Sequence, residues 1–97
     1  MNTIGGAPSL LPGQTWSALA RALRLSTREL QIVVCMIENR LETDVQIAEV
    51  LGISPHTVHT HLERLFRKLD VTSRSHLILR VFSAYVREQD MDRHRAV

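Results

Sequence analysis

The chain has few of the residues that would place it outside the cell or inside a membrane. Its 97 residues include one cysteine and four aromatic residues. The lone Cys35 excludes an internal disulfide, and its apolar neighbours indicate a position in the core. No apolar run approaches the roughly 18 to 20 residues that cross a bilayer, and residues 1–14 lack the basic and apolar segments of a signal peptide. We therefore expect a cytoplasmic protein without a membrane partner.

The sequence features of common catalytic sites are also missing. The chain contains no glycine-rich phosphate loop, no paired acids in an apolar setting and no nucleophile beside a base. His56, His59 and Glu63 can share one face of a helix, but three ligands on one exposed helix leave no enclosed pocket for a metal ion. We expect no enzyme activity, no cofactor, no bound metal and no small-molecule substrate.

Length and charge favour one compact domain with a polarised surface. Hydrophobic residues make up 44% of the chain and charged residues 23%, which is enough apolar surface for a modest core. The net charge of +2 is weakly informative, but its distribution is not even. Residues 25–53 carry two cations and five acids, whereas residues 54–80 carry five cations and two acids. The second half therefore suits a phosphate backbone.

The amino-terminal part divides into a lead and a short helix. Residues 1–14 hold three glycines and two prolines without any periodic pattern, which is typical of a flexible lead. Thr15 is a plausible N-cap for a helix over residues 15–24, in which apolar residues recur at helical spacing: Trp16, Leu19, Ala20 and Leu23. This helix either packs on the main core, which we favour, or contacts another domain or a second copy.

Helix starts are well marked in the remainder of the chain. Ser26 with Glu29 and Thr43 with Gln46 are capping boxes, and Ser54 precedes a proline at the first helical position. Thr72 or Ser73 can begin a fourth helix, and Asn39 tolerates the left-handed geometry that ends one. The predicted helices cover residues 27–38, 44–51, 55–69 and 73–87. The sequence thus predicts an all-α domain over residues 25–88, followed by a tail over residues 89–97.

Three residues mark a tight corner between two of these helices. Ala48 is small enough for close helix crossing, Gly52 can adopt the positive φ of a turn, and Val58 can anchor the following helix. The apolar residues Ile47, Leu51 and Ile53 extend the seam. Together with the helix start at Ser54, this spacing predicts a helix-turn-helix.

The helix over residues 55–69 has two distinct faces when it is projected at about 100° per residue. The apolar face consists of Val58, Leu62, Leu65, Phe66 and Leu69. The polar face displays His56, Thr60, Glu63, Arg64 and Arg67. Such a helix fits the major groove of B-DNA, so we predict that the polar face contacts base edges in double-stranded DNA.

Several short segments of the chain occur together in one known family. They are Leu25-Ser26-Thr27-Arg28-Glu29, Ile47-Ala48, Leu51-Gly52-Ile53-Ser54, Thr57-Val58, His61-Leu62, Lys68-Leu69 and Ser73-Arg74. In these segments residues 25–82 resemble the LuxR/GerE-type helix-turn-helix domain of bacterial response regulators and quorum-sensing regulators. The resemblance implies a four-helix domain of a transcription regulator, whose third helix reads DNA and whose fourth helps form a homodimer. It also implies the transcription machinery as a further candidate partner.

The resemblance also suggests roles for individual residues. The positions that face the DNA backbone in the family are Thr57, His61, Lys68 and Arg74, and those that face base edges are His59, Thr60 and Glu63. We also expect Ser54, at the start of the same helix, to contact phosphate. Lysines usual in the family are replaced by Val45 and His59, and the loop Arg40-Leu41-Glu42 is about two residues longer than usual. Two expected cations are therefore missing, which predicts weaker DNA binding. Glu63 can accept from cytosine N4 but repels phosphate.

The last predicted helix carries a wider apolar arc than one core face needs. Its members are Leu77, Ile78, Leu79, Val81, Phe82, Tyr85 and Val86. We predict that Leu77, Val81 and Tyr85 contribute to a homodimer, while contact with the Trp16 helix is the alternative. The missing cations motivate an alternative function for the same fold: a module that does not bind DNA but dimerises with another regulator and antagonises it.

Overall fold

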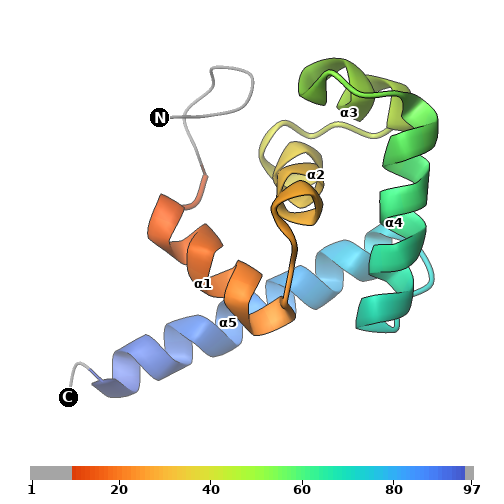
Figure 1. The fold of residues 1–97 in the computed structure, drawn as a ribbon. Coiled ribbons are helices and arrows are strands. Elements are labelled where there is room, and N and C mark those ends of the chain that lie inside the picture. Colours follow the sequence, from red (N-terminus) through yellow and green to blue (C-terminus); the bar gives the residue numbers. More distant parts are fainter. Residues whose placement is uncertain (1–9, 96–97) are drawn as a thin grey trace.

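The chain forms a bundle of helices. A computed structural model describes the backbone of residues 10–95 and the side chains of residues 10–91. The helices, shown in Figure 1, are α1 Gly13–Leu23, α2 Thr27–Glu38, α3 Asp44–Leu51, α4 Pro55–Leu69 and α5 Arg74–Arg95. No strand occurs in this described part, and the all-α fold predicted from the sequence is confirmed.

Local hydrogen bonds start the middle helices as predicted. Ser26 Oγ accepts from the Glu29 backbone N–H at 3.1 Å, while the Ser26 N–H donates to Glu29 Oε1 at 2.9 Å. Thr43 and Gln46 form the same reciprocal pair at the start of α3, at 3.1 and 3.2 Å. Both capping boxes are therefore confirmed, and they explain why α2 and α3 begin where they do.

Two helix ends differ from the prediction. Thr15 does not cap α1, which begins at Gly13 after Pro12; the Pro12 carbonyl accepts from the Thr15 N–H at 3.0 Å. The Pro12 carbonyl also accepts from the Trp16 N–H at 3.1 Å, so the first turn of the helix is already closed before Thr15 could cap it. At the end of α2, Asn39 stays right-handed and Arg40 takes the positive φ of 54°, while the Leu41 N–H bonds the Cys35 carbonyl.

The carboxyl-terminal helix is longer than predicted. The sequence predicts an end near residue 87 and a tail from residue 89, but α5 continues to Arg95. No glycine or proline follows Arg74, and four of residues 87–91 (all except Asp90) are good helix formers, so nothing stops the helix there. Residues 1–9 of the predicted lead and residues 96–97 lie outside the described residues.

The core draws on all the helices. Trp16, Leu19 and Leu23 of α1 are buried together with the apolar side chains of α2, α3, α4 and α5. The interpretation that the amino-terminal helix packs on the main core is therefore confirmed. Cys35 is free and completely buried, and this burial raises the pKa of its thiol.

One carboxylate ties the chain before α1 to the end of α2. Glu38 accepts hydrogen bonds from the backbone N–H groups of Leu10 and Leu11, at 2.7 and 3.3 Å, and from Trp16 Nε1. A buried indole N–H needs such an acceptor. Glu38 therefore helps to place α1 against α2.

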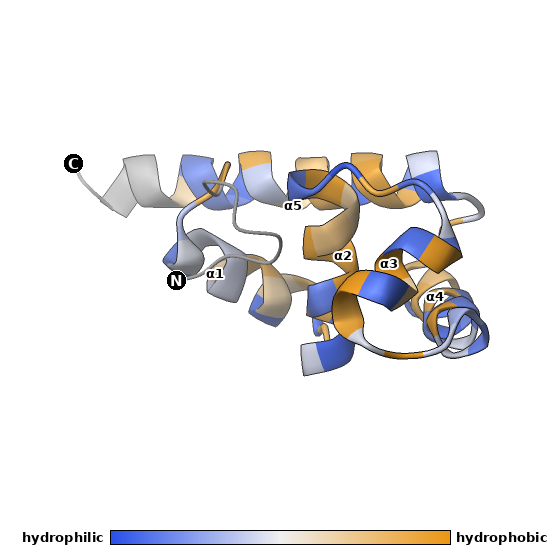
Figure 2. Cartoon of the chain, turned by 90° about the horizontal axis from the view of Figure 1, so that it is seen from above, coloured by the Kyte–Doolittle hydropathy of each residue, from blue (hydrophilic) through white to orange (hydrophobic). Residues whose placement is uncertain are grey.

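Helices α3 and α4 form one end of the molecule. Figures 1 and 2 both show α1 and α4 on opposite sides of α2, with α5 running past all of them. None of the helices in the described part is long and apolar enough to span a membrane.

Candidate nucleic-acid interface

The corner between α3 and α4 is a tight, glycine-centred turn. Gly52 has φ 69° and ψ 34°, and the carbonyl of Ala48 accepts from the N–H groups of Gly52 and Ile53. Ala48 and Val58 are buried on either side of this turn. The predicted positive φ of Gly52 is confirmed, and the burial of Ala48 and Val58 agrees with their predicted positions between the helices. A Cβ at position 52 would meet no atom within 4 Å, so the turn requires glycine for its backbone angle and not for space.

Ser54 and Thr57 cooperate at the start of α4. Ser54 Oγ accepts from the Thr57 backbone N–H at 3.0 Å and lies 2.9 Å from Thr57 Oγ1. Whichever hydroxyl donates to the other, the second keeps its own hydrogen for an outside acceptor. The pair, which we expect to contact the DNA backbone, thus retains one free hydroxyl donor at the start of the helix.

The two predicted faces of α4 are present. Val58, Leu62 and Leu65 are buried, and the two outer members of the apolar face, Phe66 and Leu69, are partly buried against the core. The residues expected to face base edges lie on the other side: His56, His59, Glu63, Arg64 and Arg67 are exposed, and Thr60 is half-buried. His61 is half-buried at the border between the two faces.

Two arginines on the exposed face are unengaged. Arg64 and Arg67 are exposed, and their guanidinium groups make no hydrogen bond or ion pair with any described residue. Each planar guanidinium can present two parallel N–H donors to an acceptor pair such as guanine O6 and N7, or to a phosphate.

Lys68 is tied to the body of the protein. Its Nζ lies 2.6 Å from Glu29 Oε1 and 2.8 Å from the Arg24 carbonyl oxygen, so two of three ammonium donors are used. Burial raises the pKa of Glu29, but the bonds from Lys68 and Ser26 and the Lys68 charge outweigh it, so the pKa lies below its ordinary value of 4.5. One N–H of Lys68 remains for a phosphate, alongside a structural role.

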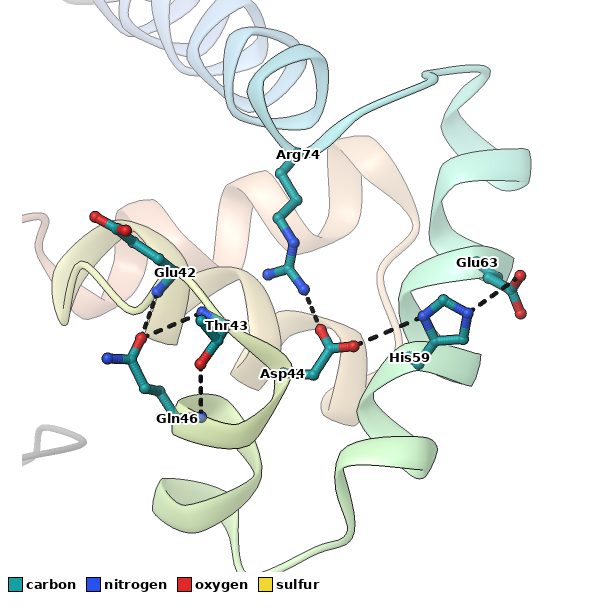
Figure 3. Close-up of polar contacts among 7 residues, drawn as sticks. All are labelled: Glu42, Thr43, Asp44, Gln46, His59, Glu63 and Arg74. Atoms are coloured by element: carbon teal, nitrogen blue, oxygen red, sulfur yellow. Dashed lines mark hydrogen bonds and ion pairs between the residues drawn. The ribbon is translucent and has the colours of Figure 1, made fainter.

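A polar network connects three helices beside the exposed face of α4 (Figure 3). The Asp44 carboxylate, in the first turn of α3, accepts from the Arg74 guanidinium at the start of α5. Its second oxygen lies 3.6 Å from His59 Nδ1, and His59 Nε2 lies 3.4 Å from Glu63 Oε2. Three residues that the sequence assigns to DNA contacts, His59, Glu63 and Arg74, are therefore held in one network.

Sequence reasoning missed the two acids that organise this surface. In the sequence, Asp44 is recognisable only as an acid in the first turn of a predicted helix. Glu29 is recognisable only as a member of a capping box. Their partners, Arg74 and Lys68, lie 30 and 39 residues further along the chain. No local pattern signals pairs at that separation.

The predicted dimer residues need correction. Leu77 and Val81 are buried in the core of the single chain, and Tyr85 is half-buried, so the first two are not available to a second copy. Among the described side chains, the exposed large apolar ones of α5 are instead Ile78, Leu79, Phe82, Val86 and Met91. The reason is that α5 packs against α1 and α4 with the Leu77 side of the wide apolar arc in the common core, while the neighbouring side stays open.

The exposed histidines of α4 are also candidate metal ligands. Among the residues that the structure describes, no group of three or more histidine, cysteine, aspartate or glutamate side chains is arranged to hold a metal ion.

The tight turn, the buried anchor and the exposed polar helix define a helix-turn-helix DNA-binding domain. The family model for bacterial regulatory proteins of the luxR family matches residues 23–81, which is more than half of the chain. The chain therefore belongs to the LuxR family, and its function is DNA binding in transcription regulation. Searches of curated proteins and of solved structures found no match.

Proposed function

We propose that the domain reads double-stranded DNA by inserting α4 into the major groove. The observation that carries this proposal is the exposed face of α4, where the Arg64 and Arg67 side chains are unpaired, opposite an apolar face that packs into the core. An α-helix fits the major groove, and an arginine bidentate to guanine discriminates against a wrong base by about 1–3 kcal/mol.

The remaining contacts divide into base reading and positioning. His56, His59, Thr60 and Glu63 share the exposed side of α4 with the two arginines, and Glu63 suits the N4 amino group of cytosine. Ser54, Thr57 and His61 lie where they can donate to phosphate oxygens. We expect Lys68 and Arg74 to contribute less to phosphate binding, because both already donate to carboxylates of the protein.

We further propose that two copies associate through α5. Ile78, Leu79, Phe82 and Val86 form an exposed apolar strip, of which Phe82 is 59% exposed. A two-fold contact along this strip brings two copies of α4 to successive major grooves, about 34 Å apart on B-DNA. The transcription machinery is then a partner of the DNA-bound dimer.

Fluorescence anisotropy with a random duplex, followed by selection of bound sites from a random DNA pool, tests this function. We expect binding that strengthens steeply as salt falls from 300 to 50 mM, and a selected site with two half-sites about one helical turn apart. Methylation of guanine N7 within a half-site is expected to interfere with binding, because N7 lies in the major groove.

The alternative function makes the opposite prediction. A module that antagonises another regulator without touching DNA shows no duplex binding at 50 mM salt, and still forms dimers. The observation that favours this alternative is the engagement of Lys68 and Arg74 with acids of the protein itself.

A further inference from the structure

Asp44 places a negative charge beside the proposed DNA-binding surface, where a carboxylate repels phosphate. It lies in the first turn of α3, and its second oxygen is 3.6 Å from the ring of His59, which is 58% exposed on the outer face of α4. A carboxylate at that distance stands at the border of the surface that we assign to DNA. Glu63, 3.4 Å from the other ring nitrogen, adds a second carboxylate.

The contact with Asp44 also determines where Arg74 points. Figure 3 shows the Arg74 side chain reaching from α5 to the Asp44 carboxylate, on the side of Asp44 away from His59. Arg74 keeps only 33% of its side chain exposed in this position. The nearest strong cation to His59 in this network is thus neutralised by an acid of the same protein.

Not all N–H donors of the Arg74 guanidinium have a hydrogen-bond acceptor in this position. Nη2 donates to Asp44, but Nη1 is buried and has no hydrogen-bond partner in the described part of the chain. A buried donor without an acceptor is unfavourable. The Asp44 carboxylate is therefore the main attraction that keeps Arg74 folded inward, and its removal frees five N–H donors on a long, flexible side chain.

From these observations we infer that Asp44 limits the DNA affinity of this domain by withholding Arg74 from the phosphate backbone. The inference rests on the proposed function, because it concerns the same DNA-facing surface. When a substitution removes the carboxylate of Asp44, Arg74 turns outward and makes one additional phosphate contact. Asp44 acts as a positioning residue, since its effect passes through Arg74.

The test measures duplex affinity of Asp44→Asn against salt by fluorescence anisotropy. We expect binding about fivefold tighter than that of the natural chain at 100 mM salt, and a plot of log K against log salt steeper by about 0.9, the value for one added phosphate contact. Asparagine keeps an acceptor oxygen, and the Thr43–Gln46 capping box at the start of α3 is untouched. Circular dichroism checks that the variant folds.

Glu49→Gln is the matched control. Glu49 is exposed on the same helix, has no ion-pair partner among the described residues, and its substitution changes the net charge by the same amount. We expect a weaker gain in affinity and an unchanged number of phosphate contacts. Equal effects of Asp44→Asn and Glu49→Gln would overturn the inference, because general charge would then explain both.

A double-mutant cycle separates the inference from the proposed function. In an Arg74→Ala background, Asp44→Asn is expected to give no more than the Glu49→Gln gain, and a full gain there would overturn the role of Arg74. If the natural chain fails to bind at 50 mM salt while Asp44→Asn binds through Arg74, the proposed function fails and the inference stands. If neither protein binds, both are overturned.

Discussion

The ammonium nitrogen of Lys68 lies 2.6 Å from Oε1 of Glu29, and this pair joins the last turn of α4 to the first turn of α2. Glu29 is the only buried charged residue in the described part of the chain. Its second task is to cap α2 through Ser26. The helix proposed to enter DNA is therefore anchored at its far end by an ion pair, and at its near end by the Gly52 turn.

Replacing Glu29 with glutamine is expected to destabilise the fold by about 1–2 kcal/mol at neutral pH. A fully buried ion pair loses ~3–5 kcal/mol when one partner is removed, but 31% of the Lys68 side chain is exposed and water screens the loss. Urea unfolding followed by circular dichroism measures the difference. Glu49→Gln, an exposed acid on α3, serves as the control and is expected to change stability by less than about 0.5 kcal/mol.

The effect of Glu29 depends on pH in one direction. Its pKa is lower in the folded protein than its ordinary value of 4.5, so its stabilisation is present above that value and is lost as the pH falls through the folded pKa. The stability difference between the natural chain and Glu29→Gln should therefore shrink as the pH is lowered below about 4.5. A difference that stays constant from pH 7 to pH 3 would contradict the ionic role of Glu29.

Arg64 and Arg67 are expected to dominate binding to DNA. Substituting both with alanine removes two unpaired guanidinium groups from the exposed face of α4 and should lower duplex affinity by at least tenfold at 100 mM salt. Arg87→Ala, which removes an exposed arginine from α5, should leave affinity within about twofold, since its charge lies outside the proposed contact surface. Anisotropy titrations give both values, and equal losses in the two proteins would contradict the assignment of α4.

Gly52→Ala is expected to destabilise the domain by about 1–2 kcal/mol. At a left-handed φ of 69°, the Cβ of an L-amino acid comes too close to the following carbonyl oxygen. No steric clash contributes, since a Cβ there meets no atom within 4 Å. Gly13→Ala is the matched control: it also has open space around it, lacks a positive φ and opens α1. Thermal unfolding should show a lower Tm for the first variant and an equal or higher Tm for the second.

Phe82→Glu is expected to abolish the proposed dimer without unfolding the chain. The side chain is exposed in the single chain, so the substitution costs little stability but places a charge in an apolar contact between copies. Sedimentation velocity at micromolar concentration measures the change. Val50→Glu introduces the same charge at an exposed apolar position on α3 and should remain dimeric. A monomeric natural chain, or equal dissociation of both variants, would rule out α5 as the interface.

The sequence by itself determined where α2, α3 and α4 begin and how α3 turns into α4. The signals are bonds between near neighbours, such as Ser26 with Glu29 and Thr43 with Gln46, or the backbone freedom of Gly52. The two faces of α4 were predictable for the same reason, because helical periodicity alone separates Val58 from Arg64.

Only the tertiary structure decided which charges are free and which side of α5 is open. Asp44 meets Arg74 and Glu29 meets Lys68 across 30 and 39 residues, and helix packing alone brings such partners together. The apolar arc of α5 is wider than one contact, so its pattern could not say that packing of the helices would bury Leu77 and leave Phe82 exposed. Local interactions join residues that are close in the sequence, so they can be predicted from it. Burial and charge pairing depend on which surfaces the folded chain brings into contact.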